Sequence, residues 1–223
     1  MQPLVFLLDV DNTLLDNDAV KKDWDEQLQV ELGPKLTTRF WEMYEQARKE
    51  RGVVDIPLAL SRLREQTPST ELDEQLYQHV RSLFFDYPFY KRLYPYTIET
   101  LEHLRTMGAT VIVSDGDLVF QAVKIIKSHL AEAVEGRVLL FTHKQEHLDE
   151  IMRAYAADHY VMVDDHPQIL SDSKRIMRDR LTTVFVKQGH YAADGLPEGF
   201  VPDLTLPHTG DLRNYQREQL LQA

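Results

Sequence analysis

Polar side chains that can carry metal and phosphoryl chemistry directly follow short apolar runs of this sequence. They are Asp9 and Asp11 after 4–8, Ser114 and Asp115 after 110–113, Lys144 after 138–141, and Asp164 and Asp165 after 160–163. Carboxylates gathered in a protein interior are costly unless a cation compensates them. A set of oxygen ligands suits Mg²⁺, which keeps coordination positions for a substrate phosphate. The pattern therefore indicates a magnesium site that also handles a phosphate group.

The sequence spacing of the carboxylates suggests a different role for each. Asp9 and Asp11 are two positions apart, so an extended strand end directs both to one side. One of them can attack while the other transfers a proton. Asp164 and Asp165 are adjacent and point opposite ways in an extended chain, so we expect one direct metal ligand, Asp165, supported by its neighbour.

Ser114, Asp115 and Lys144 are the candidates for holding a phosphate. Ser114 precedes an expected helix, so its hydroxyl and the N–H groups that follow can bind an anion. Lys144 supplies the positive charge that a phosphoryl group and an attacking carboxylate both need. Lys124 and Lys127 compete for this role, but both lie inside an expected helix rather than at a strand end. We therefore favour Lys144.

The apolar runs must be strands of one sheet if these side chains are to meet. Each run is short, continuous and bounded by polar residues, as buried parallel strands are, and a fifth spans 182–186. Helical spacing fills the gaps at 118–130, 148–155 and 169–177. Such alternation predicts an α/β fold, a Rossmann-like doubly wound parallel sheet that binds ligands beyond the carboxyl ends of its strands. The chain is expected to finish with a short strand at 203–206 and a polar helix at 211–221.

A long helical segment interrupts this alternation after the first strand. Apolar residues at i+4 steps predict a helix that ends at Gly33-Pro34, and further helices are expected near 40–47, near 56–63 and from Thr67-Pro68 onward. We therefore expect a catalytic core of residues 1–15 and 92–223, with residues 16–91 inserted as a helical cap.

The stretch Asp9-Val10-Asp11-Asn12-Thr13 resembles the first motif of the haloacid dehalogenase-like hydrolases, a superfamily made mostly of phosphatases. Ser114, Lys144 and the pair Asp164-Asp165 resemble its second, third and fourth motifs in the same order. An insertion after the first motif also agrees with the family. Asp115 departs from the pattern, because it stands where asparagine is common.

The resemblance implies a two-step phosphoryl transfer. Asp9 would attack phosphorus to form an aspartyl-phosphate, while Asp11 would protonate the leaving oxygen and then activate water. Mg²⁺ would be held by Asp9, the backbone carbonyl of Asp11, and Asp165. The haloacid-cleaving branch lacks a carboxylate at the position of Asp11, so the resemblance favours phosphate monoesters; mutase or dehalogenase activity is the alternative.

Composition narrows the classes of partner. The formal net charge is −11 without a dense Lys/Arg run, which argues against a nucleic-acid scaffold. The absence of cysteine excludes disulfides, thiolate metal sites and cysteine nucleophiles. The first apolar run is too short for a signal peptide or a membrane span. We expect a cytoplasmic enzyme of a small phosphorylated metabolite; the oligomeric state stays open.

Two other classes compete with this interpretation. His143, Glu146 and His147 match the H-x-x-E-H zinc pattern, which requires all of them on one helix. His143 follows an apolar run directly, so a loop is expected there. A receiver-like regulatory domain also gathers acids, a hydroxyl and a lysine on a parallel sheet. In such domains the acidic pair precedes the phosphorylated aspartate, which disagrees with the order here.

Overall fold

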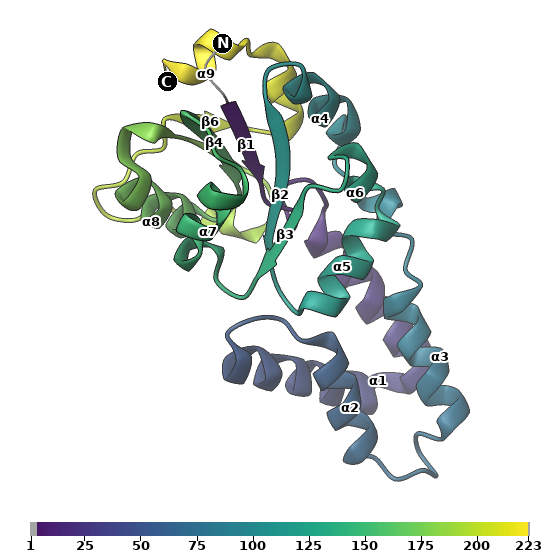
Figure 1. Ribbon diagram of the computed structural model, residues 1–223. Helices are drawn as coiled ribbons and strands as arrows, with labels where there is room; N and C mark the ends of the chain where they lie inside the picture. Colours follow the sequence, from purple (N-terminus) through teal and green to yellow (C-terminus); the bar gives the residue numbers. More distant parts are fainter. Residues whose placement is uncertain (1–3, 223) are drawn as a thin grey trace.

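A six-stranded parallel sheet forms the centre of the computed structural model, which describes residues 4–222 (Figure 1). The strands are β1 (Leu4–Leu8), β2 (Ala109–Asp115), β3 (Val138–Phe141), β4 (His159–Asp164), β5 (Leu181–Val186) and β6 (Leu204–Leu206). Their order is β3-β2-β1-β4-β5-β6. The order reverses at β1, where a doubly wound sheet opens its ligand crevice. The predicted fold class is confirmed.

Helices cover both faces of the sheet (Figure 1). They are α4 (Thr97–Arg105), α5 (Leu118–Lys127), α6 (Leu130–Ala133), α7 (Leu148–Ala154), α8 (Pro167–Met177) and α9 (Arg217–Leu221). Side chains alternate between the faces of a strand, so Phe6 and Leu8 of β1 join the apolar cluster that includes α4 and α5. Val5 and Leu7 join the cluster that includes α7 and α8. β1 is thus buried on both sides, which explains its unbroken apolar sequence.

Along the sequence, three cap helices come between β1 and β2. They are α1 (Asn17–Arg51), α2 (Ile56–Glu65) and α3 (Glu74–Phe85). α1 is interrupted at Gly33, whose φ of 71° and ψ of 170° are not helical, as Gly33-Pro34 predicts. The expected helix start at Thr67-Pro68 is wrong. α3 begins later because the Asp73 carboxylate caps it, accepting the Leu76 N–H at 2.8 Å.

The segments that enter and leave the cap helices run side by side. Leu15 forms a bridge with Leu93, and the Asp16 N–H donates to the Arg92 carbonyl at 2.8 Å. The Tyr94 N–H donates to the Leu14 carbonyl at 3.0 Å. The cap helices are therefore joined to the sheet through paired strands of chain, and Figure 1 shows them grouped beyond the carboxyl ends of β1 and β2.

Helix α5 buries only part of the apolar stripe that marks it in the sequence. Ile125 is buried, whereas Leu118 and Ile126 are 53% and 64% exposed. The buried side chains are Phe120, Gln121, Lys124 and Ile125. α5 turns these polar groups toward the strand ends, so the requirement of the site outweighs the apolar pattern.

Short 3-10 helices complete the chain and correct its expected end. They are η1 (Phe89–Arg92), η2 (Lys144–Glu146), η3 (Arg178–Arg180), η4 (His190–Ala193) and η5 (Thr209–Asn214). The continuous helix expected at 211–221 is instead η5 followed by α9, because Tyr215 is extended, with φ −100° and ψ 140°.

Candidate active site

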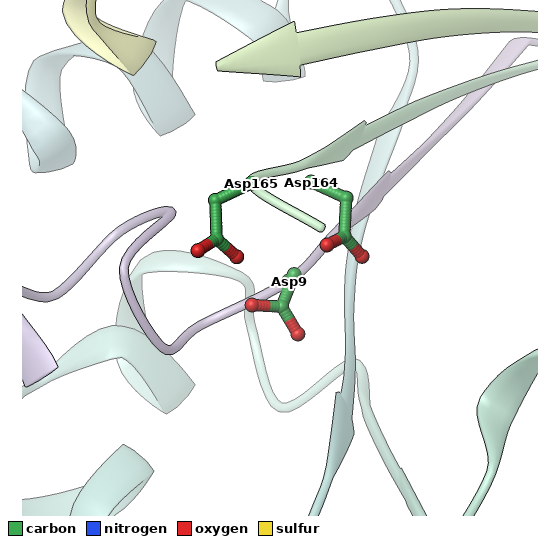
Figure 2. A group of neighbouring side chains, drawn as sticks. All are labelled: Asp9, Asp164 and Asp165. Atoms are coloured by element: carbon green, nitrogen blue, oxygen red, sulfur yellow. The ribbon is translucent and has the colours of Figure 1, made fainter. Parts of the chain in front are cut away.

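Three buried aspartates meet where β1 and β4 end. The strands pair in register up to Leu8 and Val163, so the residues that follow, Asp9 and Asp164, come out side by side. Each of Asp9, Asp164 and Asp165 offers a carboxylate oxygen within 4.8 Å of the other two (Figure 2). The expectation that the adjacent aspartates point opposite ways is wrong, because β4 ends at Asp164 and the chain bends at Asp165.

Lys144 is buried beside this cluster. Its Nζ lies 2.5 Å from Oδ1 of Asp9 and 2.7 Å from Oδ2 of Asp164. The backbone N–H of Lys144 donates to Oδ1 of Asp115 at 2.7 Å. Asp115 thus positions the loop that carries the lysine, an arrangement the sequence pattern does not show.

Hydrogen bonds hold the carboxylate of Asp164 and the backbone of Asp165 in place. Asp164 Oδ1 accepts the His166 N–H at 2.8 Å, and the Asp165 N–H donates to the Thr13 hydroxyl at 3.0 Å. Oδ2 of Asp165 is buried and has no hydrogen-bond partner among residues 4–222. A buried carboxylate oxygen without a partner is costly, so this atom is available to a ligand that supplies positive charge.

The charge balance of the cluster also favours a cation. Burial raises the pKa of Asp9; Lys144 opposes this shift, and Asp164 and Asp11 add to it. Burial likewise raises the pKa of Asp165, to which Asp164 contributes. For Lys144, burial alone would lower the pKa, but Asp164 and Asp9 outweigh it and the pKa is raised. Lys144 thus stays charged, yet one ammonium faces several carboxylates.

These carboxylates fit a hard divalent cation such as Mg²⁺. The donors of the cluster are all oxygens, and the partnerless Oδ2 of Asp165 lies among them. Asp9 and Asp165, the expected carboxylate ligands, share this cluster with Asp164. The Asp11 carboxylate lies outside it; of this residue, only the backbone carbonyl is expected to bind the ion.

Asp11 is instead paired with Lys124. The Lys124 Nζ lies 2.6 Å from Oδ1 and 2.8 Å from Oδ2 of Asp11, and its side chain is 5% exposed. Gln121 donates from Nε2 to Asp11 at 3.2 Å and to the Ser114 hydroxyl at 2.8 Å. Ser114 and Asp11 are therefore linked through one side chain of α5.

The two candidate lysines thus occupy different places in one site. Lys144 contacts Asp9, as the sequence interpretation favours, while Lys124 holds Asp11. Lys127 pairs with Asp86 at 2.7 Å, away from the cluster. The sequence feature that could have placed Lys124 in the site is its helical spacing from Gln121, which puts both side chains on one face of α5.

Residues far along the chain brace the loop after β1. Gln188 donates from Nε2 to the carbonyls of Asn12 at 3.0 Å and Thr13 at 2.9 Å. The Thr209 hydroxyl donates to the Thr13 carbonyl at 2.6 Å. No local sequence pattern identifies Gln188 or Thr209. They reach the loop after β1 only because the sheet brings the segments that follow β5 and β6 to this edge.

A cavity of about 320 Å³ opens between the strand ends and the cap helices. Asp11 and Lys124 line it from the core, and Lys21, Tyr44 and Arg48 line it from α1. This volume suits a small metabolite.

The zinc interpretation of the H-x-x-E-H pattern is not supported. Glu146 ends the short helix η2, which begins after His143. The His147 ring stacks on Phe141 with centroids 4.7 Å apart, and its Nδ1 lies 3.4 Å from Glu150. The group suited to hold an ion within residues 4–222 is the aspartate cluster, which contains neither histidine.

The fold and the site together define an α/β protein with a carboxylate centre at the switch point of its sheet. A family model described as haloacid dehalogenase-like hydrolase matches residues 4–169. The chain belongs to this family of hydrolases. The receiver-like interpretation is thereby set aside. No curated protein matches the chain.

Solved structures agree with the family. A haloacid dehalogenase-like hydrolase from Burkholderia xenovorans LB400 is 44% identical, covering 99% of this chain and 100% of its own, with a TM-score of 0.89. The L-2-haloacid dehalogenase from Xanthobacter autotrophicus is 17% identical over 96% of this chain and 98% of its own, with a TM-score of 0.62. The hydrolase YfnB from Bacillus subtilis, bound to magnesium, is 14% identical over 96% of this chain and 98% of its own, with a TM-score of 0.65. The last two show a shared fold.

In the part of the chain that the structure describes, no helix has both the length and the apolar character needed to cross a bilayer.

Proposed function

We propose that the protein is a Mg²⁺-dependent phosphatase that hydrolyses a small phosphate monoester. The observation that carries the proposal is the aspartate cluster beside buried Lys144, with a second carboxylate, Asp11, two residues after Asp9. The cluster supplies a nucleophile and a cation site, and Asp11 supplies a group for proton transfer. The family membership supports hydrolysis, and the cavity of about 320 Å³ suits a small phosphorylated metabolite.

In the first step of this mechanism, the Asp9 carboxylate attacks phosphorus and the bond to the leaving oxygen breaks. That oxygen receives a proton from Asp11, and an aspartyl-phosphate remains on Asp9. Lys144 holds Asp9 in place and offsets negative charge as the new bond forms.

In the second step, Asp11 accepts a proton from a water molecule, whose oxygen attacks phosphorus. Inorganic phosphate leaves and the Asp9 carboxylate is restored. Asp9, Asp164, Asp165 and the backbone carbonyl of Asp11 would hold Mg²⁺, which when bound neutralises charge on the phosphoryl oxygens. Ser114 would contact the phosphate near the buried Gln121.

Cleavage of a 2-haloacid is the second candidate function. It is favoured by the L-2-haloacid dehalogenase of Xanthobacter autotrophicus and the 2-haloacid dehalogenase of Pseudomonas syringae among the matching structures. In that reaction a carboxylate attacks carbon and displaces halide, so neither a cation nor a second carboxylate is required. Asp11 and the partnerless oxygen of Asp165 therefore support the phosphatase.

Steady-state hydrolysis of p-nitrophenyl phosphate and chloride release from L-2-chloropropionate, each with Mg²⁺ and with EDTA, separate the two functions. We expect Mg²⁺-dependent phosphate release, its loss in Asp9→Asn, and no chloride release. The matched control is Asp158→Asn, which changes an exposed aspartate just before β4. Phosphate release that persists in Asp9→Asn would remove Asp9 as nucleophile, and chloride release would favour the dehalogenase.

We also propose a cellular compartment and a class of substrate for the enzyme. A cysteine-free sequence suits a reducing compartment, so we place the protein in the cytoplasm. The formal net charge of −11 supports a metabolite rather than a nucleic acid as its substrate.

A further inference from the structure

We propose that the cap side of the cavity binds a second anionic group of the substrate, a carboxylate or a second phosphate, through Lys21, Tyr44 and Arg48 of α1. The inference rests on the proposed function, since it concerns which phosphate esters the site accepts. It adds that monoesters with a second negative group are hydrolysed more efficiently than monoesters without one.

Lys21 is a partly buried cation that lacks a carboxylate partner. It lines the cavity, and among residues 4–222 no acidic side chain lies within salt-bridge distance of its Nζ. The Nζ lies 5.7 Å from the ring centroid of Tyr44. Burial lowers the pKa of Lys21, although Asp11 and Asp18 act in the opposite direction. A charge desolvated in this way is stabilised by an anion that enters the cavity.

Tyr44 presents a buried hydroxyl without a partner. Its side chain lines the cavity and the residue is 2% exposed, yet its oxygen has no hydrogen-bond partner among the described residues. The same holds for Nε1 of Trp24, which also lines the cavity. Buried polar groups are nearly always hydrogen-bonded, so these two donors are suited to a ligand that offers acceptor oxygens.

Arg48 adds a second positive charge from the same helix. It follows Tyr44 at the i+4 spacing that brings side chains to one face, and it lines the cavity. Its partner is Glu45 at 3.6 Å, and both side chains of this pair are about half exposed, at 46% and 50%. So loose an ion pair leaves the guanidinium available for a bidentate contact with a carboxylate or phosphate.

The carboxylates that line the cavity are already engaged. Asp11 pairs with Lys124 at 2.6 Å, and Asp115 accepts the backbone N–H of Lys144 at 2.7 Å. Asp117 caps α5 and Asp172 pairs with Arg175. The acidic groups thus have close partners, whereas Lys21 and Tyr44 on α1 have none among residues 4–222 and Arg48 has only the exposed pair with Glu45 at 3.6 Å.

This contrast sets the polarity of the cavity. Although the chain carries a formal net charge of −11, the groups that we expect to bind on the cap side, Lys21, Tyr44 and Arg48, are all donors. The phosphoryl group would lie at the strand ends near Asp11, and the second anion against α1.

Matched pairs of esters test the proposal. For the carboxylate the pair is 3-phosphoglycerate and glycerol 3-phosphate; for the phosphate it is propane-1,3-diol bisphosphate and its monophosphate. We expect kcat/KM to be at least about tenfold higher for the member with the second anion. Lys21→Met should lower this ratio about tenfold, and Tyr44→Phe should lower it about threefold or more.

Lys22→Met is the matched control, because Lys22 is the next residue on α1 and its side chain is 77% exposed. The ratio should not change in this variant. The same pairs are titrated calorimetrically into Asp9→Asn protein, alone and combined with Lys21→Met, so that binding is measured without turnover. The arm that shows the preference identifies the second anion as carboxylate or phosphate.

The outcomes separate the two proposals. If no ester is hydrolysed but the second anion still strengthens binding through Lys21, the proposed function is wrong and the anion site is supported. If both members of each pair are hydrolysed and bound equally well, the anion site is overturned while the phosphatase stands. An equal fall of the ratio in Lys22→Met would also overturn the site, since it would reflect overall charge.

Discussion

The Nζ of Lys124 lies 2.6 Å from one carboxylate oxygen of Asp11 and 2.8 Å from the other. This contact joins the middle of α5 to the loop after β1, and Lys124 also donates to the Asn17 side chain at 3.2 Å, where α1 begins. One buried ammonium therefore ties together the core helix, the proton-transfer candidate and the first residue of the cap helices.

Lys124→Met should lower kcat for a phosphate monoester by about tenfold or more, because proton transfer requires a positioned carboxylate. Lys127→Met is the matched control on the same helix; Lys127 pairs with exposed Asp86, so kcat should stay within about twofold. Steady-state kinetics compares the variants. Equal rates in Lys124→Met and the wild type would show that the ion pair does not serve the reaction.

Asp165→Asn should make the metal-free protein more stable by about 1 kcal/mol, because it removes one of three buried, mutually repelling carboxylates. The same change should abolish the rise in Tm that Mg²⁺ gives the wild type, since a ligand stabilises only the fold that binds it. Thermal unfolding in EDTA and in Mg²⁺ measures both effects, with Asp158→Asn as control. An undiminished Mg²⁺ shift in Asp165→Asn would remove Asp165 from the ligand set.

Gly189→Ala should destabilise the protein and slow catalysis. The φ of Gly189 is +64°, and an added Cβ would lie 2.4 Å from Cγ of Asn12, which sits between Asp11 and Thr13. Gly195→Ala isolates the conformational cost, because Gly195 has φ +78° and no described atom would lie within 4 Å of its Cβ. We expect about 1 kcal/mol for Gly195→Ala and at least about 2 kcal/mol more for Gly189→Ala, measured by urea unfolding. Similar losses in both would mean that Asn12 gives way.

Asp203 should contribute stability that acid removes. Burial acts to raise its pKa, but hydrogen bonds from Lys174 and Thr183 outweigh burial and hold the pKa below the ordinary 3.8. Ionised Asp203 therefore stabilises the fold above that ordinary value, and the contribution is lost as the pH falls through the lowered pKa. Asp203→Asn should cost about 1 kcal/mol at pH 7, and this cost should shrink as the pH falls from the ordinary 3.8 through the lowered pKa. Exposed Asp179→Asn should be neutral throughout. A constant difference between Asp203→Asn and the wild type across this pH range would contradict the prediction.

The strands and the acids at their ends could be predicted from the sequence alone. A parallel strand buried on both faces needs an unbroken apolar run, and the run 4–8 coincides with β1. Polar residues that follow such runs must meet at one edge of the sheet, so the neighbourhood of Asp9 and Asp164 follows from element order. These sequence patterns are local, so they can be interpreted without knowledge of how the helices and strands pack.

The partners of the site depended on tertiary structure. Apolar spacing did not show that Gln121 and Lys124 of α5 turn inward, where Asp11 and Ser114 lie opposite them. Spacing likewise did not show that Lys21 and Tyr44 face a cavity, since a helix pattern does not say which other element stands across from it.

The sequence by itself determined the parallel α/β sheet, the helices between β1 and β2, and the resemblance to the hydrolase family. Only the tertiary structure decided that Lys144 contacts Asp9 while Lys124 holds Asp11, and that Asp164 and Asp165 face one cluster. The reason is physical: periodicity records which side chains leave water, whereas the direction of a side chain at a bend or a helix end is set by the charges and atoms that packing places opposite it.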